Sequence, residues 1–278
     1  MYACCQSEHA NGAVISVPSS SLFYEILFPQ MFTSAKPFLL LSTRGEDAAA
    51  HAEHLSFARR CGLAPAKLHQ IRLEQSRPAN LNLDNYSGVI VGGGPFNASD
   101  DDKSYLQKEV ETWFEDLLAE VLERDFPFFG ACYGVGLLGT AGHGRVSRKH
   151  GEQAAVIEVA ATPDGETDPI LEGLPARFHA IVGHKEAIEE LPGDATLLAT
   201  GKDCPVQMFR LGHNAYATQF HPELDANTFA QRLLIYANQG YYLPGTDLEA
   251  VSAARQLDVA RSGRILQNFV RLHTACRA

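Results

Sequence analysis

The sequence predicts an α/β protein with a doubly wound, mostly parallel sheet, helices on both faces and a small antiparallel β insertion. Three observations support this fold class. Apolar, strand-like runs alternate with amphipathic segments between residues 37 and 130. Two of these runs lead directly into glycine-rich turns, which is typical of the carboxyl edge of a parallel sheet. Between residues 151 and 220 the strand-like runs follow one another without helices, which favours antiparallel hairpins.

The first part of the chain supplies the alternating strands and helices. Short apolar runs predict buried strands, and a glycine directly after an amphipathic segment predicts a helix end. The predicted elements are a strand at 37–42, a helix at 46–61 that ends at Gly62, strands at 67–73 and 86–91, a helix at 105–124 and a strand at 126–129.

The second part supplies the insertion and the final helices. Its predicted elements are strands at 154–160, 180–182, 195–199, 206–209 and 214–220, and helices at 227–238 and 248–273. We therefore expect a flexible N-terminal extension over residues 1–35 and one α/β domain over residues 36–245. Residues 246–278 are expected to form a C-terminal helical extension that packs on this domain.

The composition excludes several classes of function. The 278 residues are 45% hydrophobic and carry a formal net charge of -10. An acidic chain without clustered Lys and Arg is not expected to bind nucleic acid, and no apolar stretch is long enough to span a membrane. The six cysteines form no CxxC pair, and the histidines lack metal-ligand spacing, so no metal or cofactor is expected. A free thiol is most simply kept in the reducing cytoplasm.

Cys132 is the first candidate catalytic residue. It lies at the centre of Gly130-Ala131-Cys132-Tyr133-Gly134, directly after an apolar strand. Small neighbours are needed where a nucleophile sits on a strained strand-to-helix turn. The amides of a helix that begins there favour a thiolate and point to where an oxyanion forms. The sequence therefore predicts a cysteine nucleophile rather than a buried structural cysteine.

His221 and Glu223 are the predicted partners of this nucleophile. They flank Pro222 just after a predicted strand. On extended backbone, residues two apart face the same side, so the carboxylate can accept the Nδ1 proton and fix the tautomer of the imidazole. A thiol with a distant His and an orienting acid is what acyl transfer requires.

A third motif, Gly92-Gly93-Gly94-Pro95, follows the strand at 86–91. It lacks the Lys-Ser/Thr of a P-loop and the spacing of a dinucleotide fingerprint, so phosphate binding is not expected. Backbone N–H donation to an oxyanion is the better interpretation, and a plain tight turn is the alternative.

Together these motifs resemble the class I glutamine amidotransferases, over about residues 37 to 240, with most similarity to the GMP-synthase-like branch. The resemblance implies a flavodoxin-like fold and hydrolysis of a glutamine amide through a γ-glutamyl thioester. It implies Cys132 as the nucleophile, His221 as general base and acid, and Glu223 as the orienting group. Gly94 and Tyr133 would form the oxyanion hole, and Gly93, Gly136 and His184 would lie beside the substrate.

Two departures from the family pattern bear on the substrate. Gly136 stands where the family usually has Gln, and Gly183 stands where a Ser commonly precedes the histidine. Both changes remove polar side chains from the expected pocket, and such groups normally give selectivity. The substrate is therefore predicted to be glutamine or another γ-glutamyl compound.

Three functions are consistent with the sequence. The first is a cysteine-dependent amidohydrolase that passes ammonia to a separate synthetase subunit. The second is a stand-alone γ-glutamyl peptidase, which needs no partner. The third is a non-enzymatic binding or regulatory module on the same fold. Retention of Cys132, His221 and Glu223 favours an enzyme.

Overall fold

The computed structural model describes residues 36–236 and 245–274. The predicted N-terminal extension, residues 1–35, lies outside this part of the chain. The proposed boundaries of the domain and of the C-terminal extension therefore stay predictions.

One nine-stranded sheet forms the centre of the fold, with the strand order β2-β1-β3-β4-β11-β10-β9-β6-β7. Its first five strands are mutually parallel. They are β1 (Phe38–Ser42), β2 (Leu68–Arg72), β3 (Val89–Val91), β4 (Phe128–Ala131) and β11 (Ala215–Thr218). The predicted parallel sheet is confirmed.

The parallel strands are buried on both faces because helices cover both sides. In β1, Phe38 and Leu40 join one apolar cluster, while Leu39 and Leu41 join the other. This division follows from the two-residue period of a strand. It also explains why β1 reads as a continuous apolar run.

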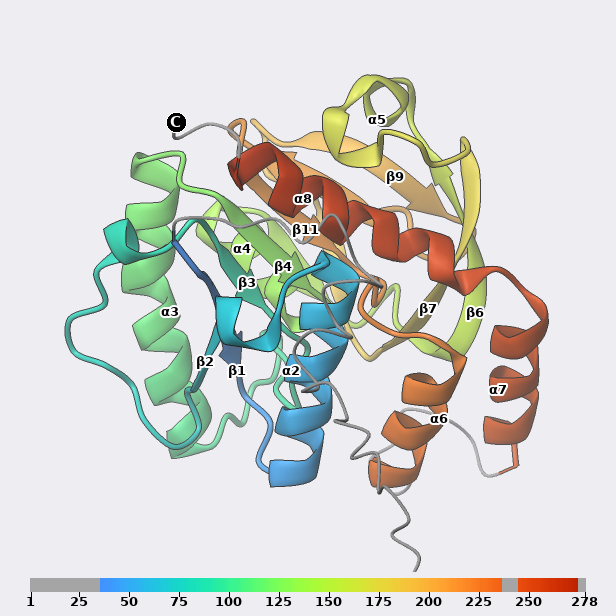
Figure 1. Ribbon diagram of the computed structural model, residues 1–278, viewed down its shortest axis with the longest axis horizontal. Helices are drawn as coiled ribbons and strands as arrows, with labels where there is room; N and C mark the ends of the chain where they lie inside the picture. Colours follow the sequence, from blue (N-terminus) through green and yellow to red (C-terminus); the bar gives the residue numbers. More distant parts are fainter. Residues whose placement is uncertain (1–35, 237–244, 275–278) are drawn as a thin grey trace, which may run out of the picture. The chain divides into compact units, whose positions relative to one another are not determined.

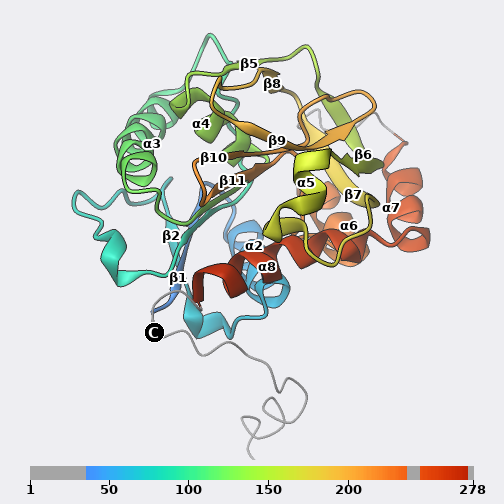
Figure 2. The same ribbon diagram turned by 90° about the horizontal axis from the view of Figure 1, so that it is seen from above.

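The helices form two layers around the sheet (Figures 1 and 2). On one side lie α3 (Tyr105–Glu123) and α4 (Tyr133–Ala141), and on the other lie α2 (Asp47–Cys61), α6 (Ala226–Ile235), α7 (Asp247–Gln256) and α8 (Arg264–Thr274). The short α5 (Pro163–Thr167) follows β6. The fold is thus a doubly wound α/β sheet, as predicted.

The antiparallel strands differ from the expected separate insertion. β10 (Met208–Leu211), β9 (Thr196–Gly201), β6 (Glu152–Ala161) and β7 (Arg177–His184) continue the main sheet beyond β11. β5 (Arg145–Ser147) pairs with β8 (Ala187–Glu190) in a separate two-stranded ribbon. The predicted strands exist, but most of them extend one sheet.

The single helix predicted over residues 248–273 is wrong. The structure has α7, a 3-10 helix at Val259–Gly263 and then α8. Leu257 ends α7 in an extended conformation. Ala250 and Ala254 of α7 pack in a different cluster from Phe269 of α8. The chain must bend between them because one straight helix cannot cover both surfaces.

Over the described residues, no helix combines the length and the apolar character that a bilayer crossing needs.

Candidate active site

The carboxyl ends of three neighbouring parallel strands meet at the candidate site. β4 lies between β3 and β11, with Val91 opposite Gly130 and Thr218 opposite Ala131. The residues that follow these strands therefore come together, although they are far apart in the sequence. This edge is where open parallel sheets normally bind ligands.

Cys132 lies on a strained turn between β4 and α4. Its backbone has φ 55° and ψ -93°, a region that a residue with a side chain rarely occupies. Its N–H donates to the Thr218 carbonyl at 2.8 Å, which ties the turn to β11. A Cβ on Gly130 would lie only 2.8 Å from the backbone of Gly134. The predicted need for a small residue at Gly130 is therefore a steric one.

His221 and Glu223 are hydrogen bonded as the sequence predicts. The His221 Nδ1 atom lies 2.8 Å from Glu223 Oε1, and the His221 backbone N–H is held by the Ile181 carbonyl of β7 at 2.8 Å. Glu223 is fully buried. A buried carboxylate on Nδ1 fixes the ring so that Nε2 faces away from it.

The charges of the site shift both pKa values. Burial lowers the pKa of His221, but the negative charges of Glu223 and Cys132 outweigh it and raise this pKa to about 9. Burial raises the pKa of Glu223, but the His221 charge outweighs it and lowers this pKa to about 2. The pair therefore favours an imidazolium and a carboxylate at neutral pH.

Gly93 brings the glycine turn against these two residues. A Cβ built there would lie 2.9 Å from His221 Cε1 and 3.5 Å from Cys132 Cβ. The position thus tolerates only glycine, and it shows that imidazole and thiol border the same small space. One pocket is lined by Gly93, Gly94, Cys132 and His221.

The two predicted oxyanion donors lie beside the nucleophile. Tyr133 is the first residue of α4, where amide groups have no intrahelical acceptor. Gly94 lines the pocket, and a Cβ there would overlap the Thr43 hydroxyl. Only a glycine lets the backbone come this close.

The structure places Gly136 and His184 away from this pocket lining. A Cβ on Gly136 would lie 3.2 Å from Ala98 Cβ and 3.3 Å from Glu186 Oε1. The Glu186 carboxylate in turn accepts the backbone N–H groups of Ala98 at 2.6 Å and Ser99 at 2.7 Å. This loop fills the space that a larger side chain at position 136 would need.

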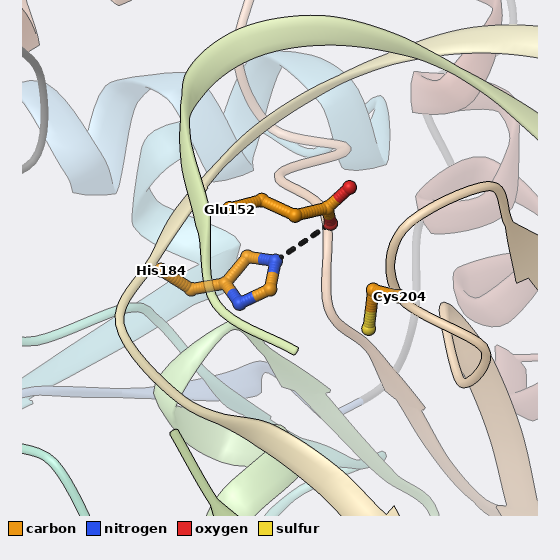
Figure 3. Close-up of side chains that lie close together, drawn as sticks. All are labelled: Glu152, His184 and Cys204. Atoms are coloured by element: carbon orange, nitrogen blue, oxygen red, sulfur yellow. Dashed lines mark hydrogen bonds and ion pairs between the residues drawn. The ribbon is translucent and has the colours of Figure 1, made fainter. Parts of the chain in front are cut away.

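His184 belongs to a buried polar cluster instead (Figure 3). Its Nε2 lies 2.8 Å from Glu152 Oε2, and its Nδ1 lies 2.8 Å from the Glu186 carbonyl. A ring that faces an acceptor at each nitrogen is bound as the imidazolium. The cluster thus contains a buried ion pair, rather than a histidine that reaches the pocket.

Cys204 lies beside this ion pair, and the potential ligand atoms of Glu152, His184 and Cys204 all lie within 4.8 Å of one another. The Cys204 thiol donates to the Val206 carbonyl at 3.4 Å. Burial and the nearby Glu152 charge raise the pKa of this thiol to about 12. A metal ion would have to deprotonate the thiol and break the His184–Glu152 bond, so the cluster is better suited to hydrogen bonding.

Two arginines of the pocket were missed from the sequence. Arg44 follows β1, and Arg232 lies on α6; both line the pocket with Cys132. A polar residue at the carboxyl end of a predicted strand was a usable signal for Arg44. No pattern marked Arg232, because its position depends on how α6 folds back over the strand ends.

Comparison with known proteins agrees with this geometry. The family model "Glutamine amidotransferase class-I" matches residues 55–237. The glutamine-hydrolysing GMP synthase of Thermosipho melanesiensis is 29% identical over 153 residues, which are 54% of this chain and 26% of that protein. The chain thus spans about a quarter of that relative's length. One of the subunits of the glutamine-hydrolysing GMP synthase from Thermoplasma volcanium is 29% identical over 54% of this chain and 69% of its own.

Solved structures agree on the fold. A glutamine amidotransferase from Thermotoga maritima superimposes with a TM-score of 0.70 at 20% identity, and the match covers 86% of this chain and 98% of that one. The family model covers well over half of the sequence, and it includes the strand ends that carry Cys132 and His221. The chain belongs to the class I glutamine amidotransferase family.

Proposed function

We propose that this chain hydrolyses the side-chain amide of glutamine or of another γ-glutamyl compound, with Cys132 as the nucleophile. The single observation that carries the proposal is the shared space above Gly93. There the strained Cys132 and the His221–Glu223 pair border one pocket. Family membership supports the same reaction class.

In the first half-reaction, the Cys132 thiolate attacks the amide carbonyl and a bond forms between sulfur and carbon. The negative oxygen is stabilised by the backbone N–H groups of Gly94 and Tyr133. His221, as the imidazolium, gives its proton to the amide nitrogen. The carbon–nitrogen bond then breaks and ammonia leaves, which produces a thioester and a neutral His221.

In the second half-reaction, neutral His221 takes a proton from water as the water attacks the thioester. The carbon–sulfur bond breaks and returns the Cys132 thiolate, while the product acid gives its own proton to solvent. Glu223 stays ionised throughout and stabilises the imidazolium form of His221, which occurs before and after each cycle.

The released ammonia implies an acceptor. The relative from Thermoplasma volcanium is one of several subunits of a GMP synthase, and this similarity supports a separate synthetase chain as the partner. A nucleophilic thiol also favours a reducing compartment, and we propose the cytoplasm.

The test measures ammonia and glutamate release from glutamine and from a panel of γ-glutamyl amides. Wild type is compared with Cys132→Ala, and Cys204→Ala is the matched control because that buried thiol lies in the separate His184 cluster. We expect turnover in wild type and in Cys204→Ala, with a loss of more than about 10³-fold in Cys132→Ala. Equal rates in wild type and Cys132→Ala, or no turnover of any amide, would contradict the proposal.

A further inference from the structure

The two pocket arginines point to the chemical class of the substrate. This inference rests on the proposed function, because it concerns the same pocket. Arg44 and Arg232 come from β1 and α6, opposite ends of the domain sequence, and neither is used by the mechanism above. Their guanidinium groups need acceptors because buried N–H donors are normally hydrogen bonded.

Arg44 is held rigidly with one edge toward the nucleophile. Its side chain is 4% exposed and its Nε donates to the buried Glu53 carboxylate at 3.0 Å. Its Nη1 donates to the Tyr236 hydroxyl at 3.1 Å. Its Nη2 would lie 2.9 Å from a Cβ on Gly93. This third nitrogen therefore reaches the space that Cys132 and His221 also border.

Arg232 approaches the same pocket from α6. Its side chain is 12% exposed, and its Nη1 lies 3.9 Å from Glu223 Oε1, beyond hydrogen-bond distance. That Nη1 is buried without a hydrogen-bond partner among the described residues. Burial, and then the charge of Arg44, lower the pKa of Arg232. Two like charges are thus buried near each other.

The rest of the lining explains what would satisfy these donors. The described residues that line the pocket include both arginines and His221, but no Asp or Glu. Most of the others are apolar, among them Ile181, Leu224 and Phe229. Such a surface suits a carboxylate, whose two oxygens match guanidinium N–H groups. An ammonium group would face like charges with no acidic side chain to receive it.

We propose that Arg44 and Arg232 form an anion subsite beside Cys132 that binds a carboxylate of the amide substrate. The subsite favours a dicarboxylic monoamide, or an acylated γ-glutamyl compound, whose free amine is absent or blocked. Glutamine itself, with a charged α-ammonium, fits this surface less well. The preferred substrate class is therefore an anionic amide without an ammonium group.

The first test does not depend on catalysis. Alkylation of Cys132 by the anionic iodoacetate and by the neutral iodoacetamide is followed on its peptide by mass spectrometry. The ratio of the two rates is divided by the same ratio for a free small thiol. We expect this normalised ratio to be about tenfold above one in wild type, because a nearby cation attracts the anionic reagent.

Variants separate the arginines from His221, which also carries positive charge. Arg44→Gln and Arg232→Gln should each bring the normalised ratio to within about twofold of one. Arg44→Lys and Arg232→Lys keep the charge, and they should retain part of the preference even if a glutamine variant fails to fold. Arg177→Gln, at a side chain that is 68% exposed, is the matched control and should match wild type.

The second test compares kcat/KM for glutaramate, glutamine and butanamide. We expect glutaramate to exceed both others by about tenfold, and Arg232→Gln to remove its advantage over butanamide mainly through KM. A wild-type normalised ratio near one, or a ratio that neither glutamine variant changes, would overturn the subsite. A preference for glutamine over glutaramate would overturn the substrate class. Selective alkylation without hydrolysis of any amide would instead contradict the proposed function and leave the subsite supported.

Discussion

The His221–Glu223 pair gives the sharpest prediction, because one substitution should change pH dependence, rate and stability together. Glu223→Gln keeps the shape of the side chain but removes the charge that lies 2.8 Å from His221 Nδ1. The His221 pKa stands at about 9 instead of 6.5. This difference corresponds to about 3 kcal/mol in favour of the imidazolium, at 1.36 kcal/mol for each tenfold change.

The sign of the pH effect follows from the direction of each shift. His221 has a raised pKa in the folded state, so its contribution to stability is full below about pH 6.5 and is lost as the pH rises through 9. Glu223 has a lowered pKa, so its contribution is present above about pH 4.5 and is lost as the pH falls toward 2. These are two views of one interaction, and their energies are not added.

We expect Glu223→Gln to lower the His221 pKa to roughly 7 to 8. The alkaline limb of kcat/KM, near pH 9 in wild type, should move down with it. The rate at its optimum should fall about 10²-fold, since a misoriented imidazole transfers protons poorly. The free energy of unfolding at pH 7 should fall by about 3 kcal/mol, because Arg232 also loses its nearest carboxylate.

The assay is kcat/KM from pH 6 to 10, combined with urea unfolding at pH 5, 7 and 10. Glu158→Gln, at a carboxylate that is 52% exposed, is the matched control and should leave both profiles unchanged. An alkaline limb that stays near pH 9 in Glu223→Gln would refute the assignment of this limb to His221 beside Glu223.

Three further predictions concern the framework of the site. Gly130→Ala should destabilise the fold by about 1–3 kcal/mol, because its new methyl group would meet backbone at 2.8 Å; thermal unfolding should show this loss, and Gly193→Ala, with nothing within 4 Å, should not. Phe269→Ala should lower the urea-derived unfolding free energy by about 3–5 kcal/mol, because this ring is fully buried under α8, whereas Leu248→Ala, 75% exposed, should change it by less than about 0.5 kcal/mol. Glu186→Ala removes the carboxylate that holds two loop amides at 2.6 and 2.7 Å, so KM for the amide should rise severalfold with a smaller change in kcat, and an unchanged KM would exclude a role for this loop in binding.

The parallel half of the fold was predictable because its physical signals are local. Residues 38–42 are an unbroken apolar run because both faces of β1 are covered. The small residues around Cys132 mark a turn whose backbone has φ 55°. His221 and Glu223 are close in sequence, so the extended backbone alone brings the imidazole and the carboxylate together.

The remaining features depend on contacts between distant segments. Arg44 and Arg232 meet only after α6 packs beside the carboxyl end of β1, and helical periodicity cannot show this. The break near Leu257 follows from two different packing surfaces, not from a strong local stop signal. Likewise, His184 finds its acceptor on Glu152, 32 residues earlier, so the sequence could not show that its ring turns away from the pocket.

The thioester on Cys132 tests the central claim most directly. Wild-type enzyme is quenched in acid during turnover of an accepted γ-glutamyl amide, and its Cys132 peptide is analysed by mass spectrometry. We predict an acyl adduct on Cys132 that appears before product accumulates and disappears when substrate is exhausted. Turnover without this adduct, an adduct confined to another cysteine, or undiminished hydrolysis by Cys132→Ala would contradict the account.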